Sequence, residues 1–271
     1  MGILQHLEEL RKRFQSVFLV FIIVFVMTLA FDIRVADVGG VPVPYPFPDM
    51  YNSIASKVFR VALEHVQPAN VTAVVFNPFD AALVQIKVAF ILAIALTVPT
   101  AAYQFGMFVR PALRPRERKI ILRIVAPSVT LFILGMLVAY YIILPPTFEF
   151  LYGLADALGV QQKFLAIDQL VDFLLIFTIA FGLAFQLPVV MWALAAAGMV
   201  SPDFWQRHWR IAVLAIFVFG AFITPDGTGV TMMMVALPML GLFVIGLAAA
   251  RAAWRRRERP EENPPEGPPG T

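Results

Sequence analysis

Cysteine is absent from this chain of 271 residues, and charged residues make up only 14% of it. The lack of cysteine excludes disulfide bonds, zinc–thiolate sites and a cysteine nucleophile. Soluble domains usually carry about 25% charged residues, whereas 60% of the residues here are apolar. The composition therefore excludes an ordinary soluble domain and predicts an integral membrane protein.

Sequence signatures of common enzymes are missing as well. The chain contains no GxxxxGK[ST], HExxH or GxSxG segment, and its three histidines are scattered at positions 6, 65 and 208. Such segments build phosphate-binding loops, zinc sites and nucleophile elbows. We therefore expect no enzyme activity, no cofactor and no metal site. Work on a substrate would have to be driven by a partner or by the membrane gradient.

Apolar runs recur along the chain, and a bilayer crossing needs about 20 apolar residues. The fifth run has 13 residues and reaches only about 20 Å as a helix, so the fifth and sixth spans should form a short hairpin. We predict an all-α membrane protein with six transmembrane helices, at about residues 14–31, 81–107, 120–144, 170–197, 211–223 and 229–250.

Prolines lie inside four of these runs, at Pro99, Pro127, Pro188 and Pro238. A proline removes one helical hydrogen bond and tends to kink a helix, although membrane helices tolerate it better than soluble ones. We therefore expect kinked helices and a concave bundle.

Residues 1–13 place apolar side chains at three- and four-residue steps between charged ones. This spacing is typical of a short amphipathic helix on the cytoplasmic membrane surface. A positively charged flank of the first span fits the same residues, and the sequence leaves both interpretations open.

Residues 32–80 are the longest polar segment and should form an outer cap on the six-helix domain of residues 14–250. The segment contains the proline-spaced VPVPYPFP, an amphipathic pattern within 50–66 and VTAVVF before a turn at Asn77-Pro78. These patterns predict a rigid extended stretch, one helix and a short strand.

Two further connections are predicted from proline and charge content. A second outer loop should begin at the double proline after Leu144 and contain a short helix. Residues 251–271 are basic and then rich in Pro, Glu and Gly, which predicts a disordered cytoplasmic tail.

Lysine and arginine are concentrated on one side of this topology. Fifteen of the 21 lie before the first span, between spans two and three, between spans four and five, or after span six, whereas four lie in the other connections. Because cationic loops stay in the cytoplasm, we expect a multi-pass protein of the cell inner membrane with both termini cytoplasmic. Clustered cations also explain the net charge of +3 without a nucleic-acid partner.

Two acids are surrounded by cations on the expected cytoplasmic side. Glu9 precedes the run RKR, and Glu117 lies in RERK, at the end of the loop FVRPALRPRERK of residues 108–119. Each acid could simply be neutralised by its own neighbours. Alternatively, the two carboxylates are accessible and bind guanidinium groups, which a carboxylate can hold through two parallel hydrogen bonds.

Several segments together resemble the C component of the twin-arginine protein translocase, the TatC family. They are HLEELRKRF, FxxPALxxxERK after YQ, PF before a Lys-bearing second span, FGLAFQLPVV in the fourth span and TPD before the sixth. The resemblance covers nearly the whole chain in order, with the topology expected above. Residues 32–74 are longer and richer in proline than the family pattern, so no family residue is transferred there.

The resemblance implies a receptor for the twin-arginine signal peptides of folded proteins. Such a receptor assembles as an oligomer with small single-span partners, TatA and TatB-like proteins, and uses the protonmotive force. By motif position, Glu9 and Glu117 would face the arginine pair. The residues that would shape the site around them are Phe108, Pro111, Leu10 and Arg11.

Gln186 and Asp226 are the polar residues expected in the membrane or at a partner contact. Gln186 stands where the family commonly has Glu, near the membrane midplane, and Asp226 belongs to the TPD segment. We expect the Gln186 amide to face the concave side, toward water or another polar group. Its alternative role is ordinary packing through a hydrogen bond to a neighbouring helix.

Two other classes of membrane protein remain as alternatives. A secondary transporter or channel for a small solute usually has polar intramembrane residues along its pathway and often has inverted repeats. This chain has few such residues and no visible repeat. A purely structural membrane scaffold would need neither Glu9 nor Glu117.

Overall fold

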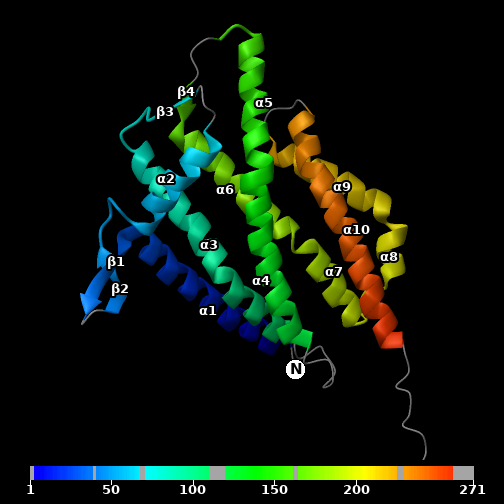
Figure 1. Ribbon diagram of the computed structural model, residues 1–271. Helices are drawn as coiled ribbons and strands as arrows, with labels where there is room; N and C mark the ends of the chain where they lie inside the picture. The colour runs from blue at the N-terminus through cyan, green and yellow to red at the C-terminus, as the bar shows by residue number, and fades with distance from the viewer. Residues whose placement is uncertain are drawn as a thin grey trace, which may run out of the picture.

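The computed structural model describes residues 3–38, 41–67, 71–109, 120–160, 164–224 and 229–258. Most of these residues are helical, and the long helices run alongside one another as a bundle (Figure 1). Helix α1 (Ile3–Ala30) packs on α3 (Asp80–Val109), and α3 packs on α4 (Ile120–Val138). On the other side of the bundle, α10 (Val230–Glu258) packs on α7 (Leu187–Ala196) and on α9 (Trp209–Ile223).

Five helical stretches in the described part of the chain are long and apolar enough to cross a membrane: Glu8–Ala30, Asp80–Met107, Val125–Ala157, Ile167–Ala196 and Val230–Arg256. Only 6% of the apolar window of the first stretch is buried in the protein. A long helix that is apolar on all sides yet unburied is stable in lipid rather than in water. Helix α9, which has 15 residues, is apolar but shorter.

Helix α1 joins two segments that were predicted separately. It continues from Ile3 to Ala30 without interruption, so a surface helix over residues 1–13 with a boundary before Phe14 is wrong. No glycine or proline occurs within this stretch to end the helix. This continuity fits the alternative interpretation, in which the basic residues are the charged flank of the first span.

The double proline does not end the third long helix, and the predicted loop after Leu144 is wrong at its start. Helix α4 continues through a π-helical turn, η3 (Ala139–Ile143), into α5 (Leu144–Ala157). Pro145 and Pro146 occupy the first turn of α5, where a missing N–H costs least. In Figure 1, α5 extends beyond the ends of the neighbouring helices.

The fourth predicted span is interrupted close to its proline. Two residues separate the end of helix α6 (Ile167–Ala184) from the start of α7. Pro188 lies in the first turn of α7. A kink was predicted at each of four prolines, and at Pro188 the structure shows an interruption between two helices. Pro99, Pro127 and Pro238 lie within helices that continue past them.

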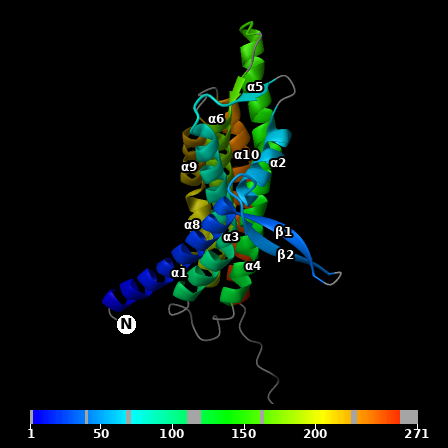
Figure 2. The same ribbon diagram turned by 90° about the vertical axis from the view of Figure 1, so that its left-hand side faces the viewer.

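The first outer segment contains strands, so the all-α prediction is wrong there. Strands β1 (Phe31–Val38) and β2 (Val41–Pro48) form an antiparallel hairpin, which projects sideways from the bundle (Figure 2). Helix α2 (Ile54–Val66) follows, with the Ser53 hydroxyl accepting a bond from the Ser56 N–H at 3.3 Å. Strand β3 (Thr72–Val74) then pairs in parallel with β4 (Phe164–Ala166).

The C-terminal helix is longer than predicted. Helix α10 continues to Glu258, eight residues past the expected boundary at 250. A short helix, α8 (Pro202–Arg207), precedes α9, and its Gln206 side chain accepts a hydrogen bond from Arg251 at 2.8 Å. The segment 251–258 is therefore not a disordered tail, and residues 259–271 lie outside the described part of the chain.

Candidate functional site

Glu9 and Arg13 lie one turn apart on α1, at the end of the bundle that holds the N-terminus. Arg13 forms an ion pair with Glu9 and also donates from Nη1 to Gln104 Oε1 of α3 at 3.2 Å. The side chains of Arg13 and Glu9 are 21% and 25% exposed. The Glu9 carboxylate is therefore held by a guanidinium while it remains partly accessible to solvent.

The neighbouring pair has the same spacing but a different environment. Lys12 Nζ lies 3.0 Å from Glu8 Oε1, and both side chains are more than 60% exposed. Pairs of this kind contribute about 0–1 kcal/mol, and among the contacts described Glu8 has none with α3. Leu10 and Arg11 are also exposed on this part of α1. Glu8 is therefore a natural control for Glu9.

The remaining predicted residues of this site can be placed only in part. Phe108 belongs to the last turn of α3, whereas Pro111, Glu117 and Asp226 lie outside the described residues. The ends of α3 and α4 that are joined by residues 110–119 lie at the same end of the bundle as the start of α1 (Figures 1 and 2). The two predicted acidic segments are thus attached to neighbouring helix ends.

Gln186 lies at the break between α6 and α7. Its Nε2 donates to the backbone carbonyl oxygen of Ser128 on α4 at 3.0 Å. This contact matches the alternative role of a packing hydrogen bond between helices. The bond links the interrupted span to its neighbour at the place where Pro188 weakens regular helical bonding.

An ion pair that sequence reasoning missed connects α3 and α6. Lys87 Nζ lies 2.6 Å from Asp172 Oδ1, with side-chain exposures of 25% and 51%. No partner was predicted for either residue. The sequence does show one base and one acid within two different apolar runs. Whether they form an ion pair depends on how the two helices are rotated against each other.

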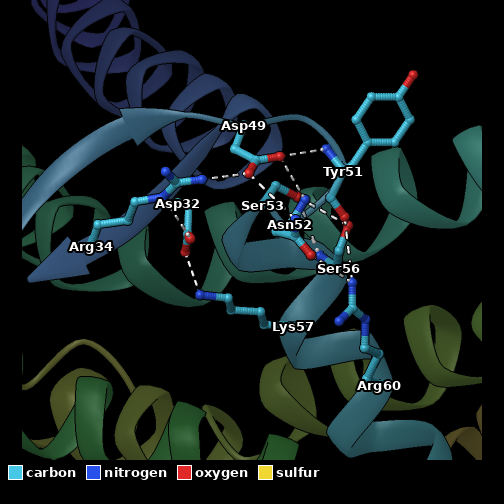
Figure 3. A network of polar contacts seen from close by, with 9 residues as sticks. All are labelled: Asp32, Arg34, Asp49, Tyr51, Asn52, Ser53, Ser56, Lys57 and Arg60. Carbon is cyan, nitrogen blue, oxygen red and sulfur yellow. Dashed lines mark hydrogen bonds and ion pairs between the residues drawn. The ribbon is translucent and has the colours of Figure 1, made fainter.

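A second polar cluster fixes the base of the β1–β2 hairpin (Figure 3). Lys57 Nζ of α2 donates to Asp32 Oδ1 at 2.5 Å, and Arg34 Nη2 donates to Asp49 Oδ2 at 2.9 Å. The bond from Lys57 is the main cause that lowers the pKa of Asp32 below its usual value. The pKa of Asp49 is also lowered, chiefly by the backbone N–H of Asn52.

No group of three or more metal-ligating side chains is found among the residues that the structure describes. The five long apolar helical stretches, one of which has only 6% of its apolar window buried, define a multi-pass membrane protein. Two features set it apart within that class: a partly exposed acid on the flank of the first span and an interrupted fourth span.

Comparison with known proteins identifies the family. The chain belongs to the TatC family, Sec-independent protein translocase protein (TatC), which matches residues 5–238. The chain is 38% identical over 257 residues to TatC of Cenarchaeum symbiosum, covering 95% of this chain and 96% of that protein. It is 32% identical over 259 residues to TatCy of Bacillus subtilis, with coverages of 96% and 92%.

A solved structure supports the same conclusion. The crystal structure of the twin arginine translocase receptor TatC is 28% identical, has a TM-score of 0.73, and covers 92% of this chain and 99% of its own. The resemblance to TatC that the sequence motifs indicated is thus confirmed, and the chain is a component of the twin-arginine protein translocase.

Proposed function

We propose that the protein is the signal-peptide receptor and core subunit of a translocase that exports folded proteins with twin-arginine signal peptides, driven by the protonmotive force. It would lie in the cell inner membrane with both termini cytoplasmic. In this arrangement α9 is the short crossing that brings the number of spans to six. The subunit assembles with small single-span partners of the TatA and TatB type and with further copies of the complex.

The observation that carries the receptor role is the environment of Glu9. Its carboxylate already binds the guanidinium of Arg13, so the site accepts the functional group that a twin-arginine peptide presents. Because the pair is partly exposed, an incoming arginine can exchange with Arg13 without opening the bundle. Charge-assisted bonds of this type contribute about 1.5–3 kcal/mol.

Gln104 provides Arg13 with a second hydrogen-bond partner during this exchange. When Arg13 is displaced from Glu9, it can keep its hydrogen bond to Gln104 on α3. The freed guanidinium would then stay at Gln104, which precedes Phe108 by four residues in the chain. We infer that Glu117 binds the second arginine of the signal, so that the two acids act jointly.

A crosslinking experiment tests the location of the site. A peptide with paired arginines and an apolar stretch, carrying a photoreactive group, should label the wild-type protein in vesicles. The Glu9→Ala, Glu117→Ala double variant should lose most of that labelling, and Glu8→Ala should keep it. Unchanged labelling of the double variant would refute the receptor site.

A secondary transporter for a small solute is the second candidate, because Lys87 and Asp172 form an ion pair within two apolar helices. Intramembrane charges often mark a solute path. A transporter would lose activity in Lys87→Met and be indifferent to the arginine pair of a peptide. Peptide binding that requires paired arginines would therefore favour the receptor.

A further inference from the structure

The β1–β2 hairpin begins at the residue that follows α1. Helix α1 ends at Ala30 and β1 starts at Phe31, so the hairpin continues directly from a helix whose side chains are largely unburied. Figure 2 shows the hairpin projecting sideways at an angle to α1, away from the helices of the bundle. The hairpin thus stands where a lipid surface adjoins α1.

The two faces of the hairpin differ in chemistry. The register pairs Ile33 with Pro46 and Val35 with Pro44, and paired residues of an antiparallel ladder share a face. This face, here called the proline face, carries no charge before Asp37 at the tip, and it consists of Phe31, Ile33, Val35, Pro42, Pro44, Pro46 and Pro48. The opposite face differs by its charges, because it carries Asp32 and Arg34 near the base together with Tyr45, Phe47 and valines toward the tip.

The prolines also determine the edge of β2. A proline has no N–H to donate, and prolines occupy every second position of β2. The residues between them must therefore supply the N–H groups of the β1–β2 ladder, which leaves the outer edge of β2 without donors. Such an edge cannot template another strand as an ordinary edge can, and it leaves fewer unsatisfied donors in apolar surroundings.

The base of the hairpin is held at a fixed angle. The Lys57–Asp32 and Arg34–Asp49 pairs attach both strands to the chain around α2, and the Arg34 guanidinium lies 3.8 Å from the centre of the Phe47 ring. At this angle a hollow of about 250 Å³ lies beside α1, and its lining combines Met27 of α1, Ile33, Pro44 and Pro46 of the proline face, and Asp32 and Tyr45 of the opposite face. The start of the proline face therefore borders a space that adjoins the side of α1, together with Asp32 and Tyr45 of the opposite face.

We propose that the proline face binds membrane lipid, in the leaflet at the end of α1 opposite the N-terminus, with the hollow filled by lipid methylene groups. Two side chains of this face, Ile33 and Val35, are 57% and 64% exposed in the protein alone. Their burial in lipid continues the apolar surface of α1, where Phe18 and Val26 are exposed as well. This binding does not depend on the receptor function proposed above.

Single-cysteine labelling tests the proposal, because the natural chain has no cysteine. Val35→Cys on the proline face and Val43→Cys on the opposite face would each carry a bimane fluorophore in phospholipid vesicles. Phe18→Cys on α1 serves as the lipid reference, and Tyr51→Cys, at a side chain that is 90% exposed, serves as the water reference. Quenching by bromine-labelled acyl chains and by iodide would be measured for each.

We expect bromolipid to quench Val35→Cys about as strongly as Phe18→Cys, with iodide quenching several-fold weaker than at Tyr51→Cys. Val43→Cys should be more accessible to iodide than Val35→Cys. A charged pair on the proline face, Ile33→Asp with Pro44→Asp, should restore iodide quenching at Val35→Cys. Quenching of Val35→Cys like that of Tyr51→Cys would overturn the proposal, and so would shielding from both quenchers, which would indicate a protein partner.

Discussion

Glu9 and Gln186 illustrate two uses of a polar side chain in this apolar chain. Glu9 is bound by a guanidinium and remains partly exposed. The Gln186 amide, by contrast, donates its hydrogen bond to the Ser128 carbonyl oxygen of a neighbouring helix. A hydrogen bond between membrane helices contributes on the order of 0.6 kcal/mol. Gln186 therefore matters for how the broken span is held rather than for total stability.

Replacement of Gln186 tests this role. Gln186→Leu cannot donate to Ser128, so it should impair transport without lowering the amount of folded protein in the membrane. Gln186→Glu should be tolerated with mild pH dependence, because a neutral carboxylic acid can donate the same bond. The measurement is export of a folded reporter together with detergent-extracted protein level. Full transport by the Leu variant would remove Gln186 from the functional residues.

The sequence was informative about individual residues only where the partner is close in the chain. Glu9 was selected because its neighbours are cationic, and its partner is four residues away. Gln104 lies 91 residues from Arg13, and the Lys87–Asp172 pair also joins different helices. Such contacts depend on how each packed helix is rotated about its axis and how far it is shifted along that axis. An apolar run in the sequence specifies neither. The approach of Glu117 to Glu9 stays a prediction.

Helices α4 and α6 approach each other closely at two glycines. A Cβ atom added to Gly135 would lie 2.6 Å from the Phe181 carbonyl oxygen, and one added to Gly182 would lie 2.8 Å from the Phe132 ring. Both distances are shorter than packed atoms allow, so alanine at Gly135 would push against the α6 backbone and alanine at Gly182 would displace the buried Phe132 ring.

We therefore expect Gly135→Ala and Gly182→Ala each to destabilise the protein by about 1–3 kcal/mol, the usual range for overpacking. The matched control is Gly241→Ala in α10, where an added Cβ meets nothing within 4 Å. Because alanine favours helix over glycine, the control should be neutral or stabilising. Unfolding in denaturant, followed by fluorescence, would show the difference, and equal stability of all three variants would contradict the close packing.

Acid should loosen the hairpin. The pKa values of Asp32 and Asp49 are lowered by their partners, so their contacts stabilise the hairpin at neutral pH. This stabilisation is lost as the pH falls below 3.8, the ordinary value, through the folded-state pKa. A pulsed EPR distance between labels at Val43→Cys and Glu64→Cys should broaden as the pH is lowered stepwise below 3.8.

The control for this measurement is the Asp32→Asn, Asp49→Asn double variant. Because neither asparagine titrates, its distance distribution should already be broad at pH 7 and should not change at pH 3. A narrow distribution that stays unchanged throughout an acid titration below pH 3.8, in the protein with both aspartates, would show that the two pairs do not hold the hairpin.

Elements were predictable to different degrees for physical reasons. Long apolar runs locate helices well, since a lipid-facing helix needs them. The extended, proline-spaced stretch was predicted, but its pairing with β1 was not, since the periodicity of one strand does not identify its partner. The continuation past Pro145 depends on the π-helical turn η3, which leaves the third helix without the expected stop.

The described part of the molecule combines five long apolar helical stretches with one shorter apolar helix, α9. Helix α9 has 15 residues and spans roughly 22 Å, against a hydrocarbon core of about 30 Å. A shorter helix is accommodated by thinning the bilayer at modest cost. We propose that the α9–α10 hairpin gathers the single-span partners at this thinned place.

Lengthening α9 tests this proposal. Insertion of about five Leu residues after Val213 would add roughly 7 Å and restore a full crossing. Transport should be abolished while binding of a twin-arginine peptide at the N-terminal end of α1 persists. The same residues added after Thr271 serve as the control. Normal transport by the lengthened variant would show that the short helix has no function.

The central claim is that Glu9 binds a signal-peptide arginine, and a binding titration tests it most directly. A fluorescent peptide with paired arginines would be titrated into the protein in lipid nanodiscs, for wild type, Glu9→Ala and Glu8→Ala. Loss of one charge-assisted bond costs about 1.5–3 kcal/mol, so Kd should rise on the order of tenfold or more for Glu9→Ala and stay near wild type for Glu8→Ala. A peptide with paired lysines should bind the wild type more weakly, because an ammonium group cannot form the two parallel bonds. Equal Kd values for Glu9→Ala and Glu8→Ala would contradict the claim.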